Sequence, residues 1–152
     1  MAQAVAPSTG HLVWRLAVKW RAELDRALAP SGLTSAQYSV LAALSAHTAM
    51  GSMPSQRELA DFVGLEPMFV SKLARALQRM ALVERHSNPS DPRALQLQVT
   101  AKGTEVAAAA RSVVAELERR RLSALGGAGG ALVKTFNAAL QTLLHGAESA
   151  HA

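Results

Sequence analysis

The chain has 152 residues, of which 49% are hydrophobic and 4% aromatic, and it carries a formal net charge of +5. This length fits one domain, and so few aromatic residues require a core of leucine, valine and alanine, which is typical of helical proteins. The absence of cysteine excludes disulfides, thiolate metal sites and cysteine-based redox sensing, while the positive charge permits a nucleic-acid partner without indicating one.

The chain begins MAQAVAPSTG, which has neither the basic start nor the apolar run of a secretory signal peptide. No later segment combines the length and the apolar character of a membrane span. We therefore expect a cytoplasmic protein without a membrane partner.

An amphipathic helix is predicted over about residues 11–30, because large apolar residues recur at every fourth position. These positions are Leu12, Leu16, Trp20, Leu24 and Leu28. Pro30 and Gly32 end the helix. His11, Trp14 and Arg15 lie off this stripe and could line a pocket for a small aromatic or anionic ligand. The alternative, which we favour, is that Trp14 packs against a second subunit.

A second helix is predicted from Thr34 to about His47. Thr34 and Gln37 have the spacing of a capping box, in which each side chain bonds the backbone of the other residue. Tyr38, on this helix, is the fourth residue of the candidate ligand site. A loop is expected over residues 48–54.

Two short helices are then predicted on either side of a glycine turn. Ser55 and Glu58 form a second capping box at the start of the first of them. Gly64 ends that helix, because glycine adopts the left-handed conformation at low cost. Pro67 suits the first turn of the following helix, where its missing N–H is not needed.

The helix that contains Pro67 in its first turn is predicted over about residues 66–80, with one apolar face and one polar, basic face. The apolar residues Val70, Leu73, Ala74 and Leu77 recur at helical spacing and should face a core. The opposite face suits contacts with DNA phosphates and base edges. Its candidate contact residues are Met68, Phe69, Ser71, Lys72, Arg75 and Arg79.

A β-hairpin is predicted next. Residues 82–85 read as a short strand, and residues 95–99 alternate between apolar and polar as a half-buried strand does. Residues 86–93, including Asn88, form a turn-rich tip. Arg93 is placed to reach a minor groove or a phosphate, and Asp91 could orient its guanidinium. The alternative is a surface hairpin with an incidental ion pair, which would add little stability.

Two helices are predicted at the end of the chain, the first from an N-cap at Thr100 to Leu125 and the second from Leu132 to Leu144. The glycine cluster at 126–130 lacks a Gly-Lys-Ser/Thr sequence, so we interpret it as an inter-helix turn. The run Arg119–Arg121 indicates a solvated helix face, with a secondary phosphate contact as the alternative. Because the first and the last two helices are apolar on one side, we expect a dimer interface; the alternative is a monomeric core.

These elements predict a mainly α fold with a small β-hairpin wing, a winged helix-turn-helix. The winged part covers about residues 34–99, and dimerisation helices cover about residues 11–30 and 101–146 of a single domain. This fold places one helix in the major groove, so we expect a sequence-specific transcription regulator that binds double-stranded DNA. Two alternatives are a nonspecific architectural DNA-binding protein and a protein-interaction module. No catalytic constellation or metal-ligand spacing is visible, so we expect no enzyme activity, metal or cofactor.

The chain resembles the MarR family of bacterial transcription regulators from about residue 12 to residue 144. The matching segments are LTSAQYSVL (33–41), RELA (57–60), VSKL (70–73), LVER (82–85), the wing motif Asp91-x-Arg93 and VTAKG (99–103). The resemblance implies a homodimer on a pseudo-palindromic operator, with a small-molecule pocket between the dimerisation helices and the winged part. We therefore expect a repressor that a small-molecule ligand can release from DNA. It also implies that Arg93 enters the minor groove while the helix at 66–80 reads the major groove.

The start of the helix at 55–63 is expected to contact backbone phosphates through Ser55, Gln56 and Arg57.

Some positions depart from the family pattern. The family often has a basic residue and a glycine where this chain has Met80 and Ala81, so we expect a differently shaped helix end. The other departures are Phe69, which is bulky on the reading face, Pro92 and Leu95 in the wing. They affect individual base contacts rather than the class of protein.

Overall fold

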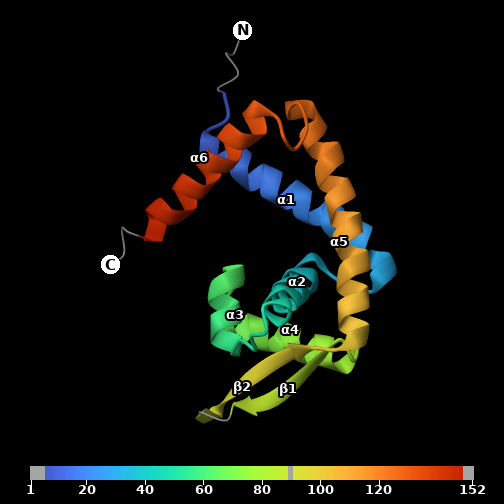
Figure 1. The fold of residues 1–152 in the computed structure, drawn as a ribbon. Helices are drawn as coiled ribbons and strands as arrows, with labels where there is room; N and C mark the ends of the chain where they lie inside the picture. The colour runs from blue at the N-terminus through green and yellow to red at the C-terminus, as the bar shows by residue number, and fades with distance from the viewer. Residues whose placement is uncertain (1–5, 89–90, 149–152) are drawn as a thin grey trace. The chain divides into compact units, whose positions relative to one another are not determined.

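The computed structural model describes residues 6–88 and 91–148, except for the side chains at 88, 91–94, 145, 147 and 148. Within this part the chain is mainly helical with one antiparallel hairpin, which confirms the predicted fold class (Figure 1). The elements are α1 (Thr9–Leu28), α2 (Ser35–Ala49), α3 (Gln56–Val63), α4 (Pro67–Arg79), β1 (Val83–Asn88), β2 (Asp91–Val99), α5 (Ala101–Leu122) and α6 (Ala131–Glu148).

The chain divides into two compact units within α5, the first ending at Val113 and the second beginning at Val114. The first unit contains α1 to α4, the hairpin and the start of α5. The second contains the end of α5 and α6. Within residues 6–88 and 91–148, no helix has the length and apolar character needed to cross a bilayer.

Both predicted capping boxes are present. The Glu58 backbone N–H donates to Ser55 Oγ over 3.2 Å, and the Ser55 backbone N–H donates to Glu58 Oε2 over 2.7 Å. Thr34 and Gln37 make the same reciprocal pair at the start of α2. Gly64 ends α3 with φ at +66°, a conformation that costs other residues about 1–2 kcal/mol. These local bonds set where α2 and α3 begin and where α3 ends.

An additional cap, which the sequence did not indicate, joins α1 to α2. Asp25 Oδ1 of α1 accepts a hydrogen bond from the Ser35 backbone N–H over 2.6 Å. Backbone and side-chain hydrogen bonds from Ser35 lower the pKa of Asp25, and Arg21 lowers it further. A carboxylate at the start of α2 is also favoured by the helix dipole.

Asp25→Asn should therefore destabilise the protein by about 1 kcal/mol at neutral pH, a typical value for a lost cap. A carboxylate whose pKa is depressed on folding stabilises the native state above its unfolded pKa. This stabilisation is lost as the pH falls below about 4. Urea unfolding of both proteins at pH 7 and pH 3 should thus show a difference that shrinks in acid. Asp61→Asn, at an exposed position of α3, is the matched control, and a pH-independent difference at Asp25 would contradict the charge-based account.

The core of the first unit consists of aliphatic side chains, as the composition requires. The four α4 residues predicted to face it are buried, together with residues from α1, α2, α3 and the hairpin. Phe62, by contrast, lies exposed on α3. The largest buried side chains of this unit are Leu28, Leu33, Val40, Leu41, Leu44, Leu59, Val70, Leu73, Leu77, Leu82, Val83, Leu97 and Val99.

The hairpin is longer than predicted. Pairing runs from Val83 opposite Val99 to Ser87 opposite Leu95, and after an irregularity Asn88 lies opposite Asp91. The predicted tip at 86–93 is therefore wrong: both strands extend into it. Backbone pairing continues through residues of weak strand propensity, because ladder hydrogen bonds do not depend on the side chains.

The hairpin is also attached to the start of α3. The Leu97 backbone N–H donates to the Pro54 carbonyl over 3.1 Å, and Ser55 forms a single bridge with Gln96. These bonds connect β2 to the loop that precedes α3, so the hairpin is fixed to the pair of helices α3 and α4 within the first unit (Figure 1).

Helix α4 ends in a left-handed turn at Ala81, whose φ is +58°. The Leu82 N–H donates to the Leu77 carbonyl and the Ala81 N–H donates to the Gln78 carbonyl, which is a Schellman cap. Lys102 Nζ also donates to the Met80 carbonyl over 3.0 Å. The expectation of a differently shaped end was wrong, since hydrogen bonds hold the usual turn here without a glycine.

Ala81→Gly should raise the free energy of unfolding by about 1 kcal/mol, because glycine removes the steric cost of the left-handed conformation. Urea denaturation measures the change. Ala108→Gly, at an exposed position inside α5, is the matched control and should lower stability by about 1 kcal/mol instead. A loss of stability at both positions would mean that Ala81 is not strained.

In the second unit, α5 ends at Leu122 and a turn of 3-10 helix extends to Leu125. The Gly127 N–H donates to the Leu122 carbonyl over 3.0 Å, and the Gly130 N–H donates to the Gly127 carbonyl over 2.9 Å. These bonds form a compact connection before α6. The interpretation of residues 126–130 as an inter-helix turn is confirmed.

Candidate nucleic-acid interface

The side of α4 that faces away from the core carries one row of exposed side chains. Met68, Lys72, Arg75 and Arg79 follow one another at helical spacing, and all are exposed; we call them the outer face of α4. Met68 is 87% exposed. Three of the four side chains are cationic at neutral pH. The row is therefore apolar at the start of the helix and basic along the rest.

Phe69 and Ser71 flank the outer face of α4. Phe69 is 39% exposed on one side, and Ser71 is half-buried on the other. Arg75 Nη2 donates to Ser71 Oγ over 3.1 Å. This bond restrains the guanidinium along the helix surface before any partner arrives, and leaves its remaining N–H groups available. The planar guanidinium suits bidentate contacts with guanine or phosphate.

The start of α3 carries the three residues predicted to contact phosphates. Ser55 and Gln56 are half-buried, and Arg57 is exposed. The capping box uses the Ser55 hydroxyl as an acceptor, and the Glu58 carboxylate sits at the same helix end. Hydrogen bonds from the Ser55 backbone and side chain lower the pKa of Glu58. Because this carboxylate would repel a phosphate, Arg57 is the strongest candidate among the three.

The predicted wing residues lie at the end of the hairpin where β1 finishes and β2 begins. Asn88 ends β1, while Asp91 and Arg93 belong to the start of β2. The side chains of these three residues lie outside the described part of the structure. The ion pair between Asp91 and Arg93 and the groove contact of Arg93 therefore stay predictions.

The candidate ligand residues are partly brought together. The rings of His11 and Trp14 lie on α1 with centroids 6.0 Å apart and planes inclined by 35°. Arg15 follows on the same helix and is exposed, while Tyr38 is half-buried on α2. Trp14 is 63% exposed, so its indole presents an open apolar surface rather than a filled pocket.

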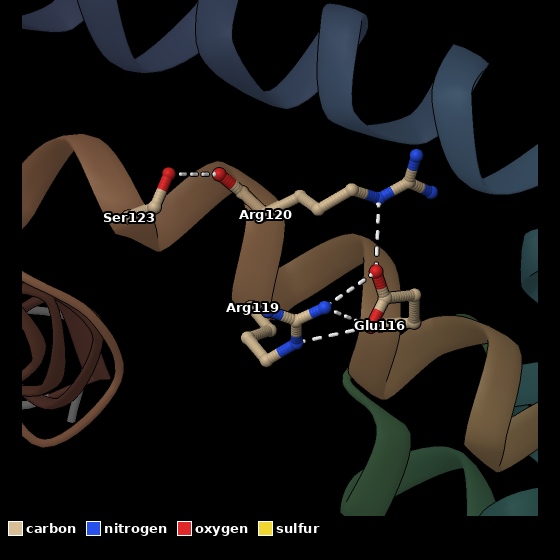
Figure 2. A network of polar contacts seen from close by, with 4 residues as sticks. All are labelled: Glu116, Arg119, Arg120 and Ser123. Atoms are coloured by element: carbon tan, nitrogen blue, oxygen red, sulfur yellow. Dashed lines mark hydrogen bonds and ion pairs between the residues drawn. The ribbon is translucent and has the colours of Figure 1, made fainter.

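The arginine run of α5 is held by a glutamate of the same helix. Figure 2 shows Arg119 and Arg120 converging on the Glu116 carboxylate, with Nη2–Oε2 and Nε–Oε1 distances of 2.6 Å and 3.5 Å respectively. Ser123 Oγ donates to the Arg120 carbonyl over 2.6 Å. The prediction of a solvated helix face is confirmed for these two arginines, whose side chains are exposed. Glu116 offsets part of their charge, which weakens the alternative of a phosphate contact.

Sequence reasoning missed two groups near this interface. Glu58 was expected only as a capping residue, yet it also brings negative charge to the helix end that should face DNA. Lys102 was not singled out, although its ammonium caps the last turn of α4. The sequence gives only a weak signal for this contact. Lys102 lies at the start of the next helix, but 22 residues of sequence separate it from Met80.

Among the described residues, no group of three or more histidine, aspartate or glutamate side chains could hold a metal ion. The chemistry available on this surface is thus that of hydrogen-bond donors, positive charge and exposed apolar groups. These are the groups with which proteins contact phosphates and base edges.

Comparisons with known proteins place this geometry in a family. A sequence model of the MarR family matches residues 31–94. A relative from Bacillus subtilis (strain 168), named an uncharacterized HTH-type transcriptional regulator, YdcH, is 32% identical over 112 residues, which cover 74% of this chain and 76% of that protein.

Two solved structures extend the likeness over most of the chain. MepR of S. aureus, in a DNA complex, matches with a TM-score of 0.83 at 23% identity over 93% of this chain and 99% of that chain, and so shares the fold. The transcriptional repressor CouR, a protein from Rhodococcus jostii RHA1, was solved on a 23-mer DNA duplex. That structure matches with a TM-score of 0.72 at 30% identity over 93% of this chain and 92% of that chain. The chain belongs to the MarR family of winged helix-turn-helix transcription regulators.

Proposed function

We propose that the protein is a homodimeric transcription repressor that binds an inverted-repeat operator and is released from it by a small-molecule ligand. The observation that carries the DNA-binding part is the outer face of α4, which is exposed and basic beside a buried apolar face. CouR, at 30% identity, is named a transcriptional repressor and was solved on a DNA duplex.

In this proposal α4 lies in the major groove. Met68, Phe69, Ser71, Lys72 and Arg75 approach bases or adjacent phosphates, with Arg79 at the groove edge. The start of α3 contacts the backbone through Ser55, Gln56 and Arg57, and Arg93 enters the minor groove with Asp91 and Asn88 beside it. The winged part, about residues 34–99, thereby serves as the DNA-binding half of the single proposed domain.

Homodimer formation is supported by apolar side chains that each terminal helix leaves exposed. On α1 these are Leu12, Val13, Trp14 and Val18, and on α6 they are Leu132, Leu143 and Leu144. Isolated exposed leucines are ordinary on a monomer, but a run along one helix marks an interaction surface. A two-fold dimer would present its two α4 helices about 34 Å apart, one turn of DNA.

Release by a ligand is supported by aromatic and basic side chains on α1 and α2. The exposed rings of His11 and Trp14, with Arg15 and Tyr38 as further candidates, suit an aromatic or anionic compound. CouR was also solved with p-coumaroyl-CoA, a compound with both properties. Such a ligand must bind the DNA-incompetent dimer more tightly than the competent one, because only differential affinity shifts the equilibrium.

The proposed role is that of a regulator rather than an enzyme. It places the protein in the cytoplasm because DNA, its partner, lies there in bacteria. Membership of a transcription-regulator family and the basic outer face of α4 support this assignment.

Selection of bound fragments from random duplex DNA tests the function directly. The selected sequences should contain a short inverted repeat that the protein binds at least about 1,000-fold more tightly than random DNA. Affinities at two salt concentrations should fall steeply with salt, since phosphate contacts release counterions. Unselective but salt-sensitive binding would indicate an architectural protein, and no binding at either concentration would favour a protein-interaction module.

A further inference from the structure

The outer face of α4 begins with an apolar side chain that the fold does not use. Met68 is 87% exposed, the most exposed large hydrophobic side chain in the described part of the chain. Phe69, the next residue, leaves 39% of its surface open. A side chain exposed to this extent gains little from burial in the free protein, so its apolar surface is available to a partner.

Met68 shares its row with three cations. Lys72, Arg75 and Arg79 follow it along the same face of the helix, so whatever covers Met68 also meets strong positive charge. An apolar protein partner would leave these charges desolvated and unpaired, which is costly. DNA satisfies both requirements, because its phosphates neutralise the cations while its groove floor meets the first turn of the helix.

The floor of the major groove offers one kind of apolar group on the edges of unmodified bases, the C5-methyl of thymine. Met68 and Phe69 have no hydrogen-bond donor in their side chains, so neither can read guanine or adenine as arginine or asparagine does. A thioether is flexible and polarizable and adapts its shape to a methyl group, and a phenyl ring can pack beside it.

We propose that Met68, with Phe69 beside it, reads a pyrimidine 5-methyl group in each operator half-site. This inference rests on the proposed function, since it requires α4 to lie in the major groove. It assigns specificity to the start of the helix and leaves phosphate or guanine contacts to the cations behind it. A 5-methylcytosine presents the same methyl group at the same ring position as thymine, so it should be read in the same way.

The test uses the operator obtained by selection. Each thymine is replaced in turn by deoxyuridine, which removes the methyl group and keeps the hydrogen-bonding edge. We expect one thymine in each half-site at which this change weakens binding about four-fold, and about ten-fold or more when both half-sites are changed, because one buried methyl group contributes about 0.8 kcal/mol.

Variants link the effect to the side chains. In Met68→Ala the loss of binding affinity caused by uracil at that position should shrink to less than about two-fold, because the methyl group has lost its apolar partner. Phe69→Ala should reduce it in part. Met50→Ala is the matched control, since Met50 is 71% exposed in the loop after α2 and should keep the full uracil effect. Unfolding midpoints of Met68→Ala and wild type should agree, because the side chain is outside the core.

A second substitution tests whether the methyl group is read in the same way on thymine and on 5-methylcytosine. Cytosine in place of the critical thymine should weaken binding, and 5-methylcytosine there should restore the part that the methyl group contributes. If an inverted repeat is bound specifically but no thymine responds to uracil through Met68, the inference is overturned while the proposed function stands. Equal weakening of Met68→Ala on thymine and uracil operators would likewise overturn it. Absence of specific DNA binding would overturn both.

Discussion

Gly103→Ala is expected to lower the free energy of unfolding by about 3 kcal/mol, the upper part of the usual range for an over-packed buried site. Gly103 is buried in the first turn of α5. A Cβ atom at this position would lie 2.0 Å from the Leu82 carbonyl oxygen and 2.7 Å from Val99 Cγ2. Both distances are far shorter than van der Waals contact, so either the helix or the chain at Leu82 must move.

Neither side of this contact can move freely. The Leu82 carbonyl accepts a hydrogen bond from the Thr100 N–H over 3.1 Å, and Thr100 Oγ1 donates to the Ala81 carbonyl over 2.8 Å. The Gly103 N–H in turn donates to Thr100 Oγ1 over 2.9 Å. Moving α5 outward to admit a methyl group would strain or break this chain of bonds, which connects the end of α4 to the start of α5.

Urea unfolding at a fixed protein concentration measures the effect, since the stability of a dimer depends on concentration. Gly10→Ala is the matched control. Gly10 also lies in the first turn of a helix, and a Cβ there meets nothing within 4 Å. We expect this control to be neutral or slightly stabilising, because alanine favours helix more than glycine does. Equal effects of the two changes would show that the close approach to Leu82 is relieved without cost.

The features that the sequence predicted well are those decided within a few residues. The capping pairs Ser55–Glu58 and Thr34–Gln37 each span three positions, so residue types and spacing alone identify them. The buried and exposed faces of α4 follow from helical periodicity in the same way. Such patterns fix which side chains face outward, and hence which ones are candidates for DNA contact.

The sequence patterns did not predict contacts between separate helices and strands. The Asp25 cap on α2 and the approach of Gly103 to Leu82 depend on how separate elements pack, and a single sequence does not state that packing. The hairpin was predicted too short for a related reason. Turn-favouring residues at 86–93 suggested a long tip, but the register set by Val83 opposite Val99 continues to Ser87 opposite Leu95, and after an irregularity the strands still pair at Asn88 and Asp91.

Ala81 shows how tertiary bonds override a local preference. Alanine is unfavourable in the left-handed conformation, so its presence after Met80 suggested another helix end. The Leu82 N–H bond to Leu77 and the caps from Thr100 and Lys102 nevertheless hold the usual turn. In the candidate site, the Ser71–Arg75 bond was likewise not foreseen, although its four-residue spacing is compatible with a contact along one helix face.

Arg75→Ala is expected to weaken operator binding by about 100-fold, because the proposed dimer loses the contact twice and each contact contributes about 1.4 kcal/mol. The Arg75 guanidinium is exposed in the middle of the outer face of α4, and its bond to Ser71 already restrains it. Its removal leaves the core untouched, so the free energy of unfolding should stay within about 0.5 kcal/mol of wild type. Binding is measured on the selected operator and on random DNA.

The salt dependence then distinguishes the two contacts that Arg75 can make. If it binds phosphate, the slope of log affinity against log salt should fall by about two, one counterion for each half-site. If it binds guanine, the slope should change less, and the variant should lose its preference at one base position. Arg111→Ala is the matched control, since it removes the same charge from an exposed position on α5. A loss for Arg75→Ala no larger than that of the control would mean that Arg75 attracts DNA only through its charge. The outer face of α4 would then have to read sequence through its remaining residues.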